Sequence, residues 1–369
     1  MKKFYSLTIV FILASISSFV PAQGAQNIIK VTDVAHQTFT GEFRDDQLAF
    51  ALLPEGRLGQ LLEKLPSAPR TWVIDGALLD EVFSMAQGYT IQSREDVTGV
   101  ETAKIWLAKL NRMTLGDEVI ALPYGNPDVA LTQRAAPSEL RSYYRYGQER
   151  VSFHLSREVV SNPAFILKQG KAKVSGQMRK MYTENRQALT RLSTVVDSEQ
   201  LRAVRARLAI LYSPMLSYKD REFFFNSAAL GVDSTLQKLR ITSGKYRLTS
   251  ESVKLPITLI NSFDVPVSVK LQLTPLNSRI QISDVKRVTL EPNSKAQLTI
   301  PLTVIASGTT SVIAQFTNKD GVVVSNDALL SLNLSVFDSQ VAWFTSGAGI
   351  LLLLAAATQT IRRIRRSRK

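Results

Sequence analysis

Apolar residues in the first two thirds of the chain follow two alternating spacings. Thr71–Ile74 (TWVI) is a short, mostly apolar run typical of a buried strand, and apolar residues then recur at helical spacing from Leu78 to Ala86. The same alternation predicts a helix around Trp106, a strand at Val119–Leu122, a helix from Pro137 to about Gly147, a strand at Val151–Leu155 and a further strand at Ala164–Leu167.

Strands separated by helices indicate a mostly parallel sheet with crossover connections. Residues 170–240 then have mainly helical spacing, without a long linker before them. We therefore predict one α/β domain over residues 27–240, with a helical C-terminal part and a partial or distorted barrel as one of its forms.

The pattern changes to short strands near Ile241. Leu255–Leu273 holds two runs rich in Val, Ile, Leu and Thr, which are separated by turn-forming residues at Asn261–Asp264. Further strand-like runs follow, with turn signals such as Asp320-Gly321 between them. About seven short strands without helical spacing predict an immunoglobulin-like β-sandwich over residues 241–337.

Both ends of the chain have patterns typical of membrane targeting. Residues 1–25 combine a basic start with an apolar run and small residues, which predicts a signal peptide; an uncleaved N-terminal anchor is the alternative. Residues 341–361 carry no charge and, at about 1.5 Å per residue, reach roughly 30 Å, which predicts a transmembrane helix. The basic tail at 362–369 then predicts a single-pass cell-membrane protein with an extracellular N-terminal domain and a cytoplasmic tail.

Composition and charge narrow the choice of partners. The 369 residues include no cysteine, which excludes disulfides, thiolate metal sites and thiol nucleophiles. The formal net charge is +14, but residues 134–207 alone hold 15 Lys and Arg against 6 Asp and Glu. This basic region indicates either attraction to an anionic envelope polymer or lipid headgroups, or simply solvated helix faces. A nucleic-acid partner is not expected outside the cell.

Four residues follow the predicted strands and form the candidate site. Asp75 ends the first strand, and Tyr124, Asn126 and Asp128 follow the second. Because ligands gather at the carboxyl ends of parallel strands, these four are the predicted ligand-binding residues. The competing interpretation is local: both aspartates precede helices and are natural N-caps, Asn126 is a turn residue, and Tyr124 is as well placed for packing as for stacking on a sugar.

The sequence lacks the motifs of other common catalytic and nucleotide-binding sites. The two histidines, His36 and His154, are far apart in sequence, and no GxSxG, P-loop or GxGxxG motif occurs. We therefore predict no metal site and no cofactor.

Several segments together resemble an uncharacterised actinobacterial family of secreted, single-span cell-envelope proteins. They are DDQLAFALLPEGRLGQLL from Asp45, TWVIDGALLDEVFSMAQGY from Thr71, ALPYGNPDVA from Ala121, LPITLINSFDVPVSV from Leu255, and the Trp343 segment with its Arg tail. The resemblance implies an envelope location and a gene that lies near the gene of a lipid II flippase-like membrane protein, which makes that protein a candidate partner. It implies no established activity. This chain looks like a short member, and it has Asn126 where the family usually has Asp.

Two hypotheses of function follow. The first is a non-catalytic envelope protein that binds a glycan, a cell-wall precursor or a membrane partner during cell-wall assembly. The alternative is a glycoside hydrolase-like enzyme that uses Asp75 and Asp128 as its carboxylate pair, which would need a separation of roughly 5 to 9.5 Å. Bonding of both carboxylates to helix amides would count against the enzyme.

Overall fold

Four parallel strands form the sheet in the N-terminal part of the computed structural model, which describes residues 27–163, 170–283, 287–335 and 348–360. Their order is β1 (Asn27–Val31), β2 (Arg70–Ile74), β5 (Glu118–Ala121) and β6 (Val160–Ser161), and every pairing is parallel. Trp72, Val73 and Ile74 are fully buried, as expected of a strand with helices on both faces.

Helices connect these strands and continue after them. They are α1 (Gln47–Leu52), α2 (Arg57–Glu63), α3 (Gly76–Ala86), α4 (Val100–Met113), α5 (Val129–Ala135), α6 (Pro137–Leu155), α7 (Gly176–Leu192), α8 (Glu199–Arg207), the 3₁₀ helix η1 (Leu208–Tyr212) and α9 (Tyr218–Leu236). A small hairpin of β3 (Tyr89–Ile91) and β4 (Arg94–Asp96) follows α3. Side chains of α3 and α4 pack with the sheet in one apolar core.

The C-terminal part is a β-sandwich of two facing sheets. One sheet has the order β12 (Arg287–Leu290), β10 (Val267–Pro275), β14 (Gly308–Thr317), β15 (Ala328–Leu334), β8 (Gly244–Leu248), and the other β11 (Ile280–Ile282), β13 (Ser294–Val304), β9 (Ser252–Asn261), β7 (Leu239–Ile241). Alternate residues such as Leu255, Ile257 and Leu259 are buried, so each long strand presents one apolar face to the other sheet.

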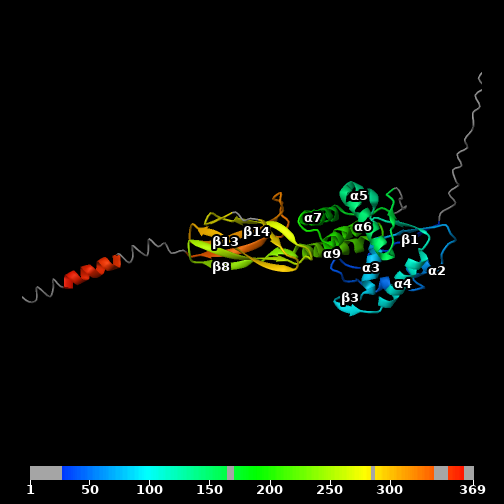
Figure 1. Ribbon diagram of the computed structural model, residues 1–369, viewed down its shortest axis with the longest axis horizontal. Helices are drawn as coiled ribbons and strands as arrows, with labels where there is room; N and C mark the ends of the chain where they lie inside the picture. The colour runs from blue at the N-terminus through cyan, green and yellow to red at the C-terminus, as the bar shows by residue number, and fades with distance from the viewer. Residues whose placement is uncertain (1–26, 164–169, 284–286, 336–347, 361–369) are drawn as a thin grey trace, which may run out of the picture.

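One continuous apolar core joins this sandwich to α7, α8, η1 and α9. Phe224 of α9 and Phe263 after β9 are both fully buried in it. Figure 1 shows α9 leading directly into the sandwich, with α3 and α4 farther away. The boundary predicted at residue 240 stays a prediction, and the apolar core is continuous across it.

The predicted fold class must be corrected at its membrane helix and its barrel. No helix in the part of the chain that the structure describes is both long enough and apolar enough to cross a bilayer. Of the predicted span, residues 348–360 are described and helical, whereas 341–347 and 361 lie outside the described residues, as do the predicted signal at 1–25 and tail at 362–369. The described four-stranded sheet is open, with β1 and β6 at its edges, rather than barrel-like.

One predicted strand was wrong, and one lies outside the described residues. Val151–Leu155 belongs to α6, where Val151 and Leu155 are buried four residues apart and Phe153 between them is exposed. Gly147 does not end this helix: a Cβ there would lie 2.2 Å from the carbonyl oxygen of Leu122, so the glycine lets α6 approach the end of β5. Residues 164–167 lie in a range that the structure does not describe.

Asn261 is expected to be the most sensitive polar position in the sandwich. Its amide nitrogen donates to the carbonyls of Val265, Leu290 and Glu291, its oxygen accepts from the amide of Phe263, and its side chain is fully buried. Asn261→Ala leaves these groups unpaired and should lower the free energy of unfolding by about 2 to 4 kcal/mol in urea titrations followed by circular dichroism. Exposed Asn333→Ala on β15 is the control and should change it by less than about 0.5 kcal/mol; equal effects of the two variants would contradict this assignment.

Candidate functional site

Asp75 and Tyr124 meet at the carboxyl ends of β2 and β5. Asp75 is the N-cap of α3, and its Oδ1 accepts hydrogen bonds from the backbone amides of Ala77 and Gly125, each at 2.9 Å. Gly125 has φ +73°, and a Cβ there would lie 2.7 Å from the side chain of Ile210. The turn after β5 therefore depends on glycine and closes over the Asp75 carboxylate.

Asp128 and Asn126 also have structural roles. Asp128 is the N-cap of α5: its Oδ1 accepts from the amide of Leu131 at 2.9 Å, and its Oδ2 from Ala172 at 3.1 Å. Asn126 is buried in the left-handed region, at φ +45°. Asp75 and Asp128 share no hydrogen-bonding partner among the described residues. The capping interpretation therefore accounts for both carboxylates.

Tyr124 packs inside the protein and does not offer a stacking surface. Its ring is buried against Tyr146 of α6, with centroids 5.0 Å apart, and its hydroxyl donates to Oδ2 of Asp80 at 2.9 Å. Oδ1 of Asp80 is held by Arg150 Nε at 2.8 Å and by His154 Nε2 at 2.7 Å. His154 is thus part of a structural cluster between α3 and α6.

A second buried charge cluster joins α3 to α8. Arg207 donates to the Glu81 carboxylate at 2.6 Å and also to the backbone carbonyl of Gln37, while the other Glu81 oxygen accepts from the amide of His36 at 2.9 Å. Both side chains are almost completely buried. No group of three or more possible metal ligands occurs among the described residues.

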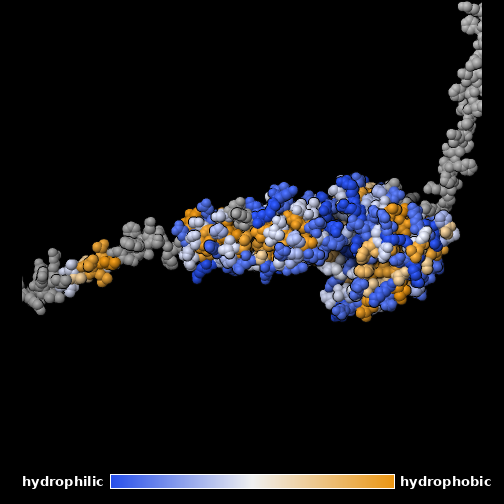
Figure 2. Space-filling view, viewed as in Figure 1, coloured by the Kyte–Doolittle hydropathy of each residue, from blue (hydrophilic) through white to orange (hydrophobic). Residues whose placement is uncertain are grey.

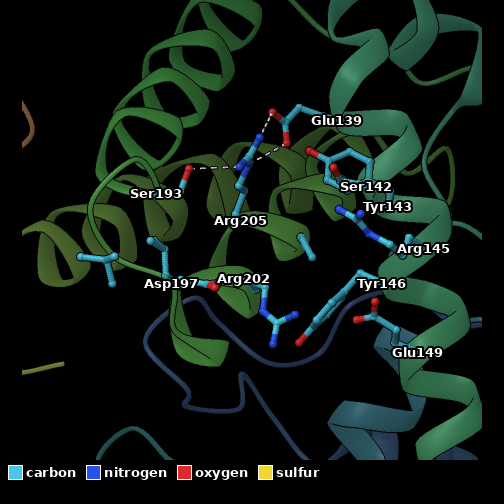
Figure 3. Close-up of a pocket in the computed structure, with 13 residues that line it drawn as sticks. Glu139, Ser142, Tyr143, Arg145, Tyr146, Glu149, Ser193, Asp197, Arg202 and Arg205 are labelled. Atoms are coloured by element: carbon cyan, nitrogen blue, oxygen red, sulfur yellow. Dashed lines mark hydrogen bonds and ion pairs between the residues drawn. The ribbon is translucent and has the colours of Figure 1, made fainter. Parts of the chain in front are cut away.

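A cleft of about 400 Å³ opens between α6, the α7–α8 loop and α8. Figure 3 shows α6 side chains on one side and those of α8 and the loop on the other. The buried part of the lining is mostly apolar or aromatic: Tyr143, Tyr146, Val196, Leu201 and Ala206. Its polar lining residues are Glu139, Ser142, Arg145, Glu149, Ser193, Asp197, Arg202 and Arg205.

Two of the three lining arginines are already paired. Arg205 makes a two-pronged contact with Glu139, at 2.9 and 2.7 Å, at one end of the cleft (Figure 3). Arg202 pairs with Glu199 at 2.7 Å, and Glu199 also accepts from the Tyr146 hydroxyl at 2.9 Å. Glu139 raises the already high pKa of Arg205, so this arginine stays charged.

None of the residues in this cleft was singled out from the sequence. The available signal was the basic stretch at 134–207, which contains the whole lining of the cleft. On the face shown in Figure 2, hydrophilic surface lies over α7 and the neighbouring part of α5, whereas apolar surface gathers over α3 and α4.

Comparison with protein families distinguishes the two regions. The model of a family of unknown function, DUF6049, matches residues 132–369. The chain belongs to this family. The DUF6049 match contains the entire cleft, whereas Asp75, Tyr124, Asn126 and Asp128 all lie before it. The cleft is therefore the better candidate for a site that serves a family function.

Other comparisons add no functional information to the DUF6049 assignment. No functionally curated protein matches the chain. Among solved structures, WR4, an MSP family member of C. elegans, aligns with 11% identity over 26% of this chain and 97% of its own, at a TM-score of 0.21.

Two further solved structures align over similar fractions of the chain. The PapD-like domain 7 of human CEP192 aligns with 14% identity over 27% of this chain and 87% of its own, at a TM-score of 0.21. For an alpha-2-macroglobulin fragment from Escherichia coli the identity is 17%, over 26% of this chain and only 16% of that one, also at 0.21.

Asp75 should give the protein an unusual dependence of stability on pH. Burial raises the pKa of its carboxyl to about 7, although the amides of Ala77 and Gly125 oppose this rise. The folded state then holds a proton that the unfolded state releases near pH 4, so this residue's contribution to stability is present at low pH and is lost as pH rises through 7.

The variant Asp75→Asn keeps a capping oxygen and cannot ionise. It should be more stable than the wild type at pH 8, by roughly 2 to 4 kcal/mol, and equal to it near pH 4, in urea unfolding at both values. The control is Asp197→Asn, which removes an exposed carboxylate and should have the same stability as the wild type at both pH values. A variant less stable than the wild type at pH 8 would contradict the raised pKa.

Proposed function

We propose that this protein is a non-catalytic cell-envelope protein that binds a glycan or cell-wall precursor in the cleft between α6 and α8. The observation that carries this proposal is the cleft itself. It is concave, is lined by apolar and aromatic as well as polar and charged side chains, and lies wholly within the family-matched residues. Small-molecule sites in proteins usually combine these features.

The rim carboxylates argue against the enzyme alternative. A hydrolase needs one carboxylate free to act as an acid and another free to act as a nucleophile or base. Asp75 and Asp128 instead bond to the amides of α3 and α5. The geometry therefore supports binding better than hydrolysis.

The envelope location and the partners rest on the sequence. The resemblance to secreted actinobacterial envelope proteins supports an extracellular cleft, and it also suggests a lipid II flippase-like membrane partner. The basic stretch at 134–207 would favour an anionic envelope polymer near the cleft.

Filling the cleft should weaken glycan binding. Ser142 lines the cleft on α6, whereas Arg141 beside it is exposed and does not line it. Ser142→Trp should weaken binding of N-acetylglucosamine oligomers to the purified full-length chain at least about tenfold in calorimetry, because the indole occupies the ligand's space. Arg141→Trp is the matched control and should bind like the wild type. Lack of binding by the wild type, or equal binding by both variants, would refute the proposal.

Envelope location can be tested with one introduced thiol. The chain has no cysteine, and Ser307 lies on the exposed end of the sandwich before β14. Ser307→Cys should react with a membrane-impermeant maleimide in intact cells as fully as it does after lysis, with the cysteine-free wild type giving the background. Labelling only after lysis would place the sandwich inside the cell.

A further inference from the structure

Three charged side chains at the cleft have no partner in the part of the chain that the structure describes. Arg145, Glu149 and Asp197 line it, and none of them forms an ion pair or side-chain hydrogen bond among the described residues. Arg145 and Glu149 are four residues apart on α6, yet they do not pair with each other. The other lining charges are satisfied by the Arg205–Glu139 and Arg202–Glu199 pairs.

These three charges have both signs and lie on both sides of the cleft. In Figure 3, Arg145 and Glu149 project from α6, and Asp197 lies on the opposite side, in the loop before α8. All three are exposed and hydrated in the free protein. A ligand that fills the cleft displaces this water, and a charge that loses its water without gaining a partner opposes binding.

This cost discriminates between classes of ligand. The hydroxyls of a neutral sugar can hydrogen-bond to the arginine and the two carboxylates, but they compensate none of the three charges. A purely anionic ligand would pair with Arg145 but would be repelled by Glu149 and Asp197. A ligand with a carboxylate and an ammonium group can compensate charges of both signs, so it should bind more tightly than a neutral or a purely anionic ligand.

We infer that the ligand of this cleft is zwitterionic: a glycopeptide whose peptide part has a carboxylate for Arg145 and an ammonium group for Asp197 and Glu149. This inference rests on the proposed function, because it names the ligand of the same site. The glycan part occupies the apolar lining, and the peptide part supplies the charges. The planar guanidinium of Arg145 is suited to a two-pronged contact with a carboxylate.

The test compares matched ligands on the purified full-length chain. The probes are chitobiose, chitobiose joined through the α-amine of the dipeptide lysyl-alanine, the same conjugate with a C-terminal amide, and the conjugate with an acetylated lysine side chain. The conjugate with both charges should bind about tenfold more tightly than chitobiose, and each modification should remove much of this gain at low salt.

Protein variants assign each ligand charge to its partner. In Arg145→Gln, amidation of the ligand should no longer weaken binding, and in the double variant Glu149→Gln, Asp197→Asn, acetylation should have no effect. Arg141→Gln, on the same helix outside the cleft, is the control and should retain both penalties. Such non-additive effects identify direct pairs, which a general change in folding would not produce.

The outcomes separate this inference from the proposed function. If chitobiose binds and the conjugate gains nothing, or if the amidation penalty persists in Arg145→Gln, the ligand is not the zwitterion described here and the glycan-binding proposal stands. If neither chitobiose nor any conjugate binds, both proposals fail.

Discussion

The buried ion pair between Glu81 and Arg207 is the contact on which the relative position of the helices depends. It joins α3, which packs on the parallel sheet, to the end of α8, which forms one side of the cleft. Breaking such a pair is costly because it leaves one charge buried without a partner. Here the backbone of His36 and Gln37 also bonds to the pair, so α3, α8 and the segment after β1 are fixed together.

The aromatic contact between Tyr124 and Tyr146 links the cleft lining to α3. Tyr124 is fixed through Asp80 on α3, and its ring packs against Tyr146, which lines the cleft from α6. The residue predicted from the sequence to bind a ligand therefore supports the cleft from behind. Both sides of the cleft are positioned by buried polar contacts to α3, and its charged lining residues can remain exposed.

Local patterns in the sequence predicted the parts of the fold that depend on local physics. The apolar run at Thr71–Ile74 is a buried strand, and Asp75 is an N-cap, because a side chain and the amides two residues later suffice for that role. The β-sandwich follows similarly from alternation of buried and exposed residues along strands such as β9. No helix in the described part of the chain is long and apolar enough to cross a membrane, although the uncharged run at 341–361 and the basic tail after it had predicted one.

Contacts distant in sequence decided what local patterns could not. Gly147 looked like a helix end, but only the carbonyl of Leu122, a residue outside that segment, shows why α6 needs a glycine there. The cleft is equally non-local, because its sides come from α6 and from residues about fifty positions later. Which of its charges are unpaired depends on the ion pairs that Glu139 and Glu199 form with Arg205 and Arg202. Ion pairs within the protein thus neutralise part of the positive charge at 134–207. What the cleft offers a ligand is a small set of unpaired charges of both signs beside an apolar surface, which is a more selective arrangement than a net positive patch.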